Sequence, residues 1–333
     1  MSKAAERTIE AISDDAENPF WSVMIPTRGC SPYLEQTLLG VREQDPGPEE
    51  MQIAIVDDAS TGGLVEEVAR RVFGSRVEIH RSSTPLGIAG NWNRCIDLSR
   101  GRWIHLLHQD DLVLPGFYER LADADLIKPE AGAAFCRTWL VDCDGERTGI
   151  SDLERDTAGV CENWLERIAV SNRIKCPSIV VRRQIYEKLG GFRSDLAFTL
   201  DWEMWARIAC QFPVYYEPDA LAAFRVHDDS ETSRLCDDGS NVLDLLRAIE
   251  IVNEYLPANQ RSELHEQSLR YCVQHALHCA RQMLRVKNHQ AAHAQLKEAL
   301  KLDPSLRMSA HVWNLYGRSV WSWLRGNTVS RHA

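Results

Sequence analysis

Short apolar runs alternate with stretches of helical periodicity along most of the chain. Apolar runs of about four to eight residues are typical of buried strands, and apolar residues spaced about three or four apart are typical of amphipathic helices. The pattern predicts strands at residues 21–25, 51–56, 77–80, 102–107, 131–141, 179–181 and 221–226. It predicts helices at residues 33–43, 64–71, 89–99 and 183–189, another that begins near residue 201, and only helical periodicity from about residue 240 onward. Strands separated by helices indicate βαβ units, so we expect an α/β fold with a mainly parallel sheet.

Polar or acidic clusters follow three of these strands directly. They are Thr27–Arg28, Asp57–Asp58 and Asp110–Asp111, and the first strand is expected to stop at Pro26. In an open α/β sheet, ligands bind beyond the carboxyl ends of the strands, so we expect the three clusters to converge on one ligand. Adjacent acids there can hold a divalent metal against a phosphorylated ligand, because hard cations prefer oxygen donors. The alternative is structural, because Asp also serves as a helix N-cap and in turns.

Charge and composition narrow the classes of partner. A net charge of −10 argues against a nucleic acid, whose phosphates require clustered Lys and Arg. The negative charge does not exclude a single nucleotide as ligand, because one metal ion or Arg can neutralise its pyrophosphate. Residues 1–18 lack the apolar centre of a secretory signal, and no apolar run approaches the ~20 residues that span a bilayer. We therefore expect a soluble, cytoplasmic protein. The ten cysteines include no C-x-x-C pair, which argues against a zinc ribbon or a redox dithiol.

Six motifs occur in an order and spacing that resemble the family-2 glycosyltransferases. They are Val23–Arg28, Ile55–Ser60, Gly87–Arg94, Leu107–Asp111, Gly190–Phe192 with Leu200–Trp205, and Phe224–His227. The resemblance spans roughly residues 22–233. It implies the GT-A fold, which is Rossmann-like with a mainly parallel sheet flanked by helices. It also implies a nucleotide-diphosphate sugar as donor, a divalent metal (Mn²⁺ or Mg²⁺) and inversion at the anomeric carbon.

The resemblance assigns the metal to Asp110, the second acid of the family's Asp-x-Asp motif. His227, in the Arg-x-His element, is implied to reach the metal or the diphosphate. His108 replaces the first acid of the motif. Its imidazole can hydrogen-bond a ribose or phosphate and tolerates Mn²⁺ better than Mg²⁺. Asp111 is expected either to support the metal ligands or contact the ribose, or to act as a helix N-cap.

The same resemblance implies a set of donor contacts. The residues implied to bind the nucleotide are Pro26, Thr27, Arg28, Asp57, Asp58, Asn93, His108 and Asp111. Asp57 and Asp58 would accept hydrogen bonds from the base and ribose, unless they bond to their own loop in Asx turns. Arg28 either faces the nucleotide or is an ordinary exposed residue after a strand.

Asp201 is the implied catalytic base. A sugar hydroxyl is a poor nucleophile until a carboxylate takes its proton during attack. The family usually has Glu-Asp at this point, whereas this chain has Leu200–Asp201. The base is therefore kept and the flanking acid is lost. The structural alternative is that an Asp in a first helical turn complements the helix dipole.

Three segments are predicted along the chain: a flexible N-terminus (1–18), a GT-A domain (19–235) and an all-helical extension (236–333). Ala291–Pro304 resembles one tetratricopeptide-type helix, which must pack on the catalytic domain or on a partner because a single unit cannot bury its own face. The final predicted helix, about 311–325, is amphipathic and rich in aromatic residues. Such a helix can contact a membrane peripherally at its inner face, cap a core or form a dimer.

These observations predict an inverting glycosyltransferase. It would move a sugar from a nucleotide-diphosphate donor to a hydroxyl of a saccharide or lipid-linked acceptor, in surface polysaccharide or glycolipid synthesis. One alternative is a sugar nucleotidyltransferase, although that class generally has a longer Gly-rich, basic loop after the first strand than Thr27–Cys30. The other is a non-catalytic binding or scaffold protein with a decayed site. His108 and Leu200 favour this second alternative, and Asp110, Asp201 and His227 argue against it.

Overall fold

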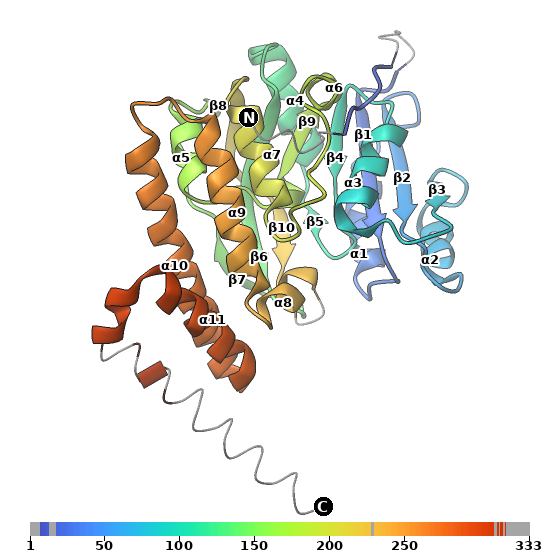
Figure 1. The fold of residues 1–333 in the computed structure, drawn as a ribbon. Helices are drawn as coiled ribbons and strands as arrows, with labels where there is room; N and C mark the ends of the chain where they lie inside the picture. The colour runs from blue at the N-terminus through green and yellow to red at the C-terminus, as the bar shows by residue number, and fades with distance from the viewer. Residues whose placement is uncertain are drawn as a thin grey trace, which may run out of the picture. The chain divides into compact units, whose positions relative to one another are not determined.

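The computed structural model describes residues 7–12, 18–227, 230–309, 312, 314–315 and 317 (Figure 1). Contacts divide the chain into two compact units. The first contains the residues up to Ile168, Asn172–Asp195 and Leu200–Val226. The second contains Ala169–Ser171, Leu196–Thr199 and the residues from His227 onward.

The first unit is built on one mixed sheet. Its strands lie in the order β3-β2-β1-β4-β9-β6-β10-β5, with β7 beside β6 and β8 beside β10. The strands from β3 to β4 are parallel, β9 is antiparallel to both of its neighbours, and β6 and β10 are parallel to each other. The strands are β1 (Trp21–Thr27), β2 (Met51–Asp57), β3 (Glu78–Arg81), β4 (Trp103–Leu106), β5 (Leu112–Val113), β6 (Ala133–Val141), β7 (Arg147–Ile150), β8 (Gly159–Val160), β9 (Ile179–Arg182) and β10 (Val214–Arg225).

Helices follow most of these strands, as the sequence pattern predicts. They are α1 (Leu34–Arg42), α2 (Leu64–Phe73), α3 (Gly87–Leu98), α4 (Phe117–Ile127), α5 (Trp164–Val170), the 3₁₀ helix η1 (Cys176–Ser178), α6 (Arg183–Leu189) and α7 (Leu200–Ala209). The predicted α/β class is confirmed. The sheet is mixed, because β9 lies antiparallel between β4 and β6 and separates the parallel strands β3 to β4 from the parallel pair β6 and β10.

Helix α2 shows why these segments fold as they do. Its buried residues recur at helical spacing, including Val65, Val68 and Val72. Two acids occupy the first turn and two arginines the last turn, which complements the helix dipole. Gly74 at the C-cap has φ +59°, a conformation that glycine adopts without strain.

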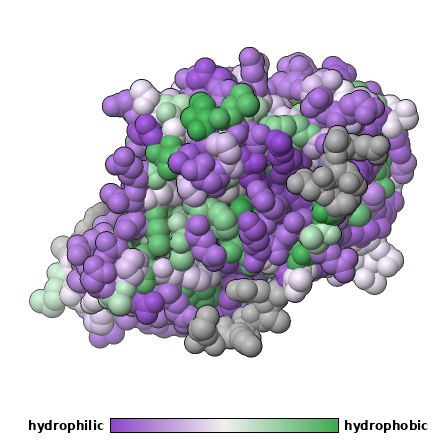
Figure 2. Space-filling model, turned by 90° about the horizontal axis from the view of Figure 1, so that it is seen from above, coloured by the Kyte–Doolittle hydropathy of each residue, from purple (hydrophilic) through white to green (hydrophobic). Residues whose placement is uncertain are grey.

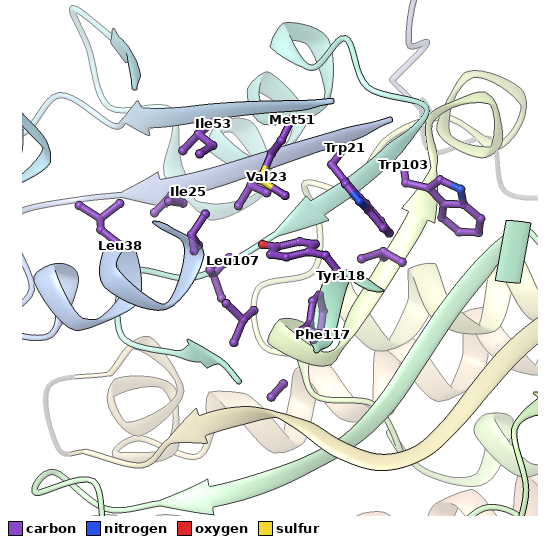
Figure 3. Packing of buried hydrophobic residues seen from close by; sticks show 14 of the residues in the cluster. Trp21, Val23, Ile25, Leu38, Met51, Ile53, Trp103, Leu107, Phe117 and Tyr118 are labelled. Carbon is purple, nitrogen blue, oxygen red and sulfur yellow. The ribbon is translucent and has the colours of Figure 1, made fainter. Parts of the chain in front are cut away.

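The main core lies against the parallel half of the sheet. Figure 3 shows Val23 and Ile25 of β1 and Ile53 of β2 grouped with Leu38 of α1 and Phe117 of α4. All seven residues of β1 and of β2 are buried, because both faces of a parallel sheet are covered. This is why the strands appear in the sequence as continuous apolar runs instead of alternating ones.

The prediction that β1 stops at Pro26 is wrong, because the strand continues to Thr27. Along β1, the carbonyl of Met24 accepts from Leu107 on the β4 side and that of Thr27 accepts from Asp58 on the β2 side. Backbone groups of alternate residues in a strand point to the same side. The position of the N–H that Pro26 lacks therefore faces β4, as the carbonyl of Met24 does. The ladder with β4 has already ended at Met24, so no hydrogen bond is lost.

Strand β10 begins earlier than predicted, at Val214 instead of residue 221. Glu217, Pro218 and Asp219 interrupt the apolar pattern there, and the pairing with β6 shifts register after Glu217. The Glu217 side chain is buried and accepts a two-pronged hydrogen bond from Arg120 at 2.9 and 3.0 Å. A buried acid with its own cation is compatible with a strand, although the one-dimensional pattern does not predict it.

The second unit is helical. Its elements are α8 (Glu231–Cys236), α9 (Ser240–Tyr255), α10 (Arg261–Arg285), α11 (His289–Leu302) and the 3₁₀ helix η2 (Pro304–Met308). The tetratricopeptide-like segment lies in α11 and at the start of η2, and α11 packs on α10 of the same unit. Their shared apolar cluster contains Ala280 and Leu284 of α10 and Ala292 and Leu296 of α11, and Val312 and Leu315 from beyond η2 join it.

No helix in the described part of the chain is long and apolar enough to cross a bilayer. The face drawn in Figure 2 is mostly hydrophilic, and its hydrophobic residues form separate patches, which is ordinary for a globular surface. Most of the predicted N-terminal segment 1–18 and of the predicted helix 311–325 lies outside the described residues. Membrane contact and dimerisation through that helix therefore stay predictions.

Candidate active site

The ends of β1, β2 and β3 meet at Asp57. Its buried carboxylate accepts from Arg81 Nε at 2.7 Å and from Thr27 Oγ1 at 3.4 Å, and it also bonds the Ser60 hydroxyl. Arg81 therefore neutralises Asp57 at the carboxyl edge of the sheet. The predicted convergence of Thr27 and Asp57 is present in the structure.

Asp58 closes the loop that leads into α3. Its two carboxylate oxygens accept the main-chain N–H groups of Leu86 at 2.5 Å and Gly87 at 3.1 Å. Asp58 therefore has a structural role, but it bonds a distant loop and not its own loop as the Asx-turn alternative predicts. Pro26 and Thr27 are buried beside it, whereas Arg28 is exposed.

Asn93 joins α3 to the segment before α7. Its Nδ2 donates to the carbonyl of Phe192 at 2.9 Å, and its Oδ1 accepts from the Phe192 N–H at 2.7 Å. A Cβ on Gly191 would lie 2.2 Å from the same Oδ1, so only glycine fits beside this amide. Both polar atoms of the Asn93 amide already bond the main chain of Phe192, so Asn93 is not proposed to contact the nucleotide.

Asn93→Ala is expected to lower the free energy of unfolding by about 1–3 kcal/mol, because two buried main-chain groups of Phe192 lose their partners. Urea denaturation of the variant and the parent protein measures this difference. Unchanged stability together with weakened nucleotide binding would instead place Asn93 on the ligand.

His108, Asp110 and Asp111 form a group suited to a metal ion. One ligand atom from each lies within 4.8 Å of the others, and among the described residues no second such group occurs. His108 Nδ1 is 3.7 Å from Asp111 Oδ2, and the His108 ring lies against Trp92 with centroids 4.8 Å apart. Among the described residues, no hydrogen-bond partner contacts the buried atoms His108 Nε2 and Asp111 Oδ2. Because buried polar atoms usually have a partner, these two atoms are suited to bind a ligand.

Electrostatics support the same interpretation. Burial lowers the pKa of His108, and the charge of Asp110 opposes this shift. The imidazole is therefore neutral and keeps a lone pair for a metal. Burial raises the pKa of Asp111 well above its usual range, Asp110 raises it further, and Arg225 and Lys175 oppose the shift. Two crowded acids of this kind attract a cation.

Arg225 supports this acidic loop from β10. Its main-chain N–H donates to Asp111 Oδ1 at 2.9 Å, and its Nε donates to the carbonyl of Asp110 at 3.0 Å. The buried guanidinium also donates to Gln36 at 2.9 Å and stacks on Tyr33 at 4.2 Å. Arg225 is therefore committed to the framework of the site.

Asp201 lies in the first turn of α7. Its Oδ2 accepts from Asn172 Nδ2 at 3.1 Å, and its Oδ1 accepts from the main-chain N–H of Trp202 at 2.7 Å. Burial raises the pKa of Asp201, while Trp202, Asn172 and the charge of Lys175 oppose this shift. A carboxylate with a raised pKa is a better proton acceptor than an exposed one.

The segment at η1 connects the two groups of acids. The charge of Lys175 acts on both Asp111 and Asp201. Burial raises the pKa of the Cys176 thiol, and the charges of Asp201, Asp111 and Asp110 raise it further. Asp201, Asp110 and Asp111 therefore all act electrostatically on the segment at η1, and a base and a metal that act on one substrate stay a prediction.

His227 does not belong to the group of three possible metal ligands found among the described residues. It is the first residue of the second unit after β10, and its carbonyl accepts from Ser233 Oγ at 2.9 Å. Its contact with a metal or diphosphate stays a prediction.

The sequence profile described as glycosyl transferase family 2 matches residues 22–189, half of the chain. The chain belongs to glycosyl transferase family 2. The predicted family is thereby confirmed, and the chain is a glycosyltransferase.

Relatives support this assignment. Uncharacterized protein MT1568 of Mycobacterium tuberculosis is 27% identical over 272 residues, which cover 75% of this chain and 82% of that protein. A PGL/p-HBAD biosynthesis glycosyltransferase of Mycobacterium bovis is 30% identical over 95 residues, 28% of this chain and 36% of that protein. The second match is confined to a short segment.

Solved structures share the fold of this family-2 member. Staphylococcus aureus TarS 1-349 in complex with UDP matches with a TM-score of 0.60 at 14% identity, covering 91% of this chain and 88% of that one. The mannosyltransferase PcManGT of Pyrobaculum calidifontis, in complex with GDP-Man and Mn²⁺, matches with a TM-score of 0.57 at 20% identity, covering 92% and 85%. At these identities the likeness shows the fold alone, and it confirms the predicted GT-A class.

Sequence reasoning missed three residues of this glycosyltransferase site. Arg81 ends β3, so the strand-end rule would have found it if that strand had not been predicted to stop at residue 80. Asn172 and Lys175 lie in an irregular segment before β9, where no periodicity marks them. Only their contacts with Asp201 and Asp111 reveal them.

Proposed function

We propose that this family-2 member is an inverting, metal-dependent glycosyltransferase that moves a sugar from a nucleoside-diphosphate donor to an acceptor hydroxyl. Two groups of residues support the proposal. One is the cluster of His108, Asp110 and Asp111 with its unpartnered buried atoms. The other is Asp201, a carboxylate whose pKa is raised by burial.

The donor set fits a divalent cation. His108 Nε2 and Asp111 Oδ2 have no partner, and Asp110 adds a second carboxylate beside them. These three residues would hold the ion. A divalent cation there would neutralise the charge that develops on the leaving diphosphate. One imidazole and two carboxylates suit Mn²⁺ better than Mg²⁺, which prefers oxygen donors alone.

Asp201 is proposed to take the proton of the attacking hydroxyl. Asn172 and the N–H of Trp202 hold the two carboxylate oxygens in place, and burial favours the protonated product of that transfer. A single base that assists direct attack gives inversion at the anomeric carbon. In this proposal one carboxylate acts as the base, and Leu200 stands where the family usually has a flanking acid.

The nucleotide is proposed to lie beyond β1, β2 and β4, near Thr27, Asp57 and Arg28. Solved structures of similar fold hold UDP, UDP-GlcNAc or GDP-Man, so the donor is proposed to be a sugar on one such nucleoside diphosphate. The relative that matches over 95 residues is a PGL/p-HBAD biosynthesis glycosyltransferase, which supports a role in biosynthesis. We propose a saccharide or lipid-linked hydroxyl in surface polysaccharide or glycolipid synthesis.

The test is turnover of a donor panel by the purified full chain. UDP-GlcNAc, UDP-glucose, GDP-mannose, dTDP-glucose and CMP-sialic acid are each incubated with Mn²⁺, and release of the nucleotide is measured. Metal-dependent release from one nucleoside-diphosphate sugar supports the proposal. Release of pyrophosphate from a nucleoside triphosphate and a sugar phosphate would identify a nucleotidyltransferase instead.

His108→Asp is expected to move the metal preference from Mn²⁺ toward Mg²⁺. The wild-type chain should be about tenfold more active with Mn²⁺ than with Mg²⁺, because a nitrogen donor favours the softer ion. The variant presents oxygen donors alone, so the ratio should fall toward one. Activity is titrated with each metal in both proteins. An unchanged ratio would show that His108 does not contact the metal.

A further inference from the structure

A side chain of α9 holds the loop that leads into α7. Asp244 Oδ1 accepts the N–H of Ala197 at 3.0 Å. Asp244 Oδ2 accepts the N–H groups of Phe198 at 2.9 Å and Thr199 at 2.8 Å, and the Thr199 hydroxyl at 2.7 Å. Four donors on consecutive residues therefore converge on one carboxylate. Ala197, Phe198, Thr199 and Asp244 all belong to the second unit.

A second residue of the helical unit contacts the segment before Asn172. Ser268 Oγ, on α10, lies 2.9 Å from the carbonyl of Ala169 and 2.8 Å from that of Leu264, and its one proton is shared between them. Ala169–Ser171 belongs to the second unit and directly precedes Asn172, which donates to Asp201. Asn172 and Asp201 thus each follow, within three residues, a segment that contacts a helix of the second unit. Residues 197–199 contact α9, and Ala169 contacts α10.

We propose that Asp244 is a positioning residue: it holds residues 197–199, which lead directly into α7, and thereby orients Asp201. The inference rests on the proposed function, because it takes Asp201 as the base. Thr199 is the last residue before α7, two positions before Asp201. The proposal gives Asp244 an indirect part in catalysis, without any contact to the substrate.

Physical chemistry favours this role for a carboxylate. The first N–H groups of a helix and the loop before it lack partners within the helix, and a negative charge there is stabilising. Thr199 is 2% exposed, so its hydroxyl needs the partner that Asp244 provides. A misplacement of about 1 Å in a reacting group can reduce the rate about 100-fold, which is why a loop anchor affects a base that it does not touch.

The test compares matched variants of the full chain. Asp244→Asn keeps the shape but sets an amide N–H against the loop donors, and Thr199→Val removes one hydroxyl without loss of volume. Each is expected to lower kcat for donor turnover by about 10- to 100-fold while the donor KM changes less than about twofold. Thr199→Ser, which keeps the hydroxyl, should stay close to wild type. Glu254→Gln, an exposed acid on the same helix, is the control for lost charge.

Hydrogen exchange measured by mass spectrometry adds a readout that needs no turnover. In Asp244→Asn, exchange should rise in the peptide that begins α7 and includes Trp202, whose N–H bonds Asp201. Peptides from β1 and β2 should be unchanged. Unchanged exchange in the α7 peptide, or unchanged kcat in Asp244→Asn, overturns the inference. Full activity of Asp201→Asn would instead overturn the proposed base, so the two failures are distinguishable.

Discussion

Asp201→Asn is expected to reduce sugar transfer by about 10²- to 10⁴-fold, the usual contribution of a positioned general base. The substitution keeps the shape of the side chain and removes its ability to take a proton. The N–H of Trp202 and the amide of Asn172 can still reach one oxygen of the new side chain. The donor and the metal should therefore bind as they do in the wild type, and the loss of activity should appear as a lower kcat.

The control is Glu263→Gln, which removes an acid from the first turn of α10. It tests the alternative in which Asp201 only complements a helix dipole, because the charge change and the helical position are the same. Kinetics and melting temperature are measured for both variants. Transfer at the wild-type rate by folded Asp201→Asn would remove Asp201 as the base.

The pH profile gives the same prediction in the unmodified chain. Burial raises the pKa of Asp201, and the active form is the ionised one. Activity is therefore retained above the raised pKa and lost as the pH falls through it. The acid limb of kcat should lie above the value of about 3.9 that an unperturbed Asp would give. Asp201→Asn should lack this limb.

Asp110→Asn is expected to reduce activity by at least about 100-fold, because a metal ion contributes several kcal/mol of charge stabilisation to the leaving group. The variant keeps the size of the side chain but removes one of the two carboxylates beside His108. The metal concentration for half-maximal activity should rise. Asp144→Asn, an exposed acid in the turn after β6, should behave as wild type.

Superimposable Mn²⁺ titrations of Asp110→Asn and wild type would contradict the assignment of the metal. If both proteins lost activity equally on treatment with EDTA, the ion would be bound elsewhere. His227, which the sequence also assigns to the metal, would then be the next residue to test.

The position of the site could be predicted because it depends on a topological rule. Parallel strands end at the same edge of a sheet, so Asp57 and Asp110 could be placed near one another from the positions of two apolar runs. The rule needs only the direction of each strand. It therefore works even though β1 was predicted to be too short and β5 was not predicted.

The partners of these acids could not be predicted, because they come from distant parts of the chain. Asn93 bonds Phe192, and Asp58 bonds Leu86, through main-chain groups that carry no sequence signal. Asp244 looks like any polar residue on an amphipathic helix, yet it holds the loop before α7. Residue type and spacing predict which groups can do chemistry, and tertiary contacts decide which groups are already occupied.

The departures from the family pattern are explained by the local structure. His108 brings a nitrogen atom into the acidic group, where burial keeps the imidazole neutral. Leu200, in place of the flanking acid, is 3% exposed and so belongs to the core beside the base. Neither change removes the unpartnered atoms at the proposed metal site or the carboxylate at Asp201, which argues against a decayed site.

The most direct test of the central claim is a thermal-shift measurement with UDP-, GDP-, dTDP- and CMP-sugars, in Mn²⁺ or in EDTA. A ligand at about 100 times its Kd stabilises the folded state by about 2.7 kcal/mol. We predict that one nucleoside-diphosphate class raises the melting temperature in Mn²⁺, and that EDTA or Asp110→Asn abolishes the shift. A folded protein that no nucleotide sugar stabilises, or one stabilised equally in EDTA, would contradict a metal-dependent glycosyltransferase.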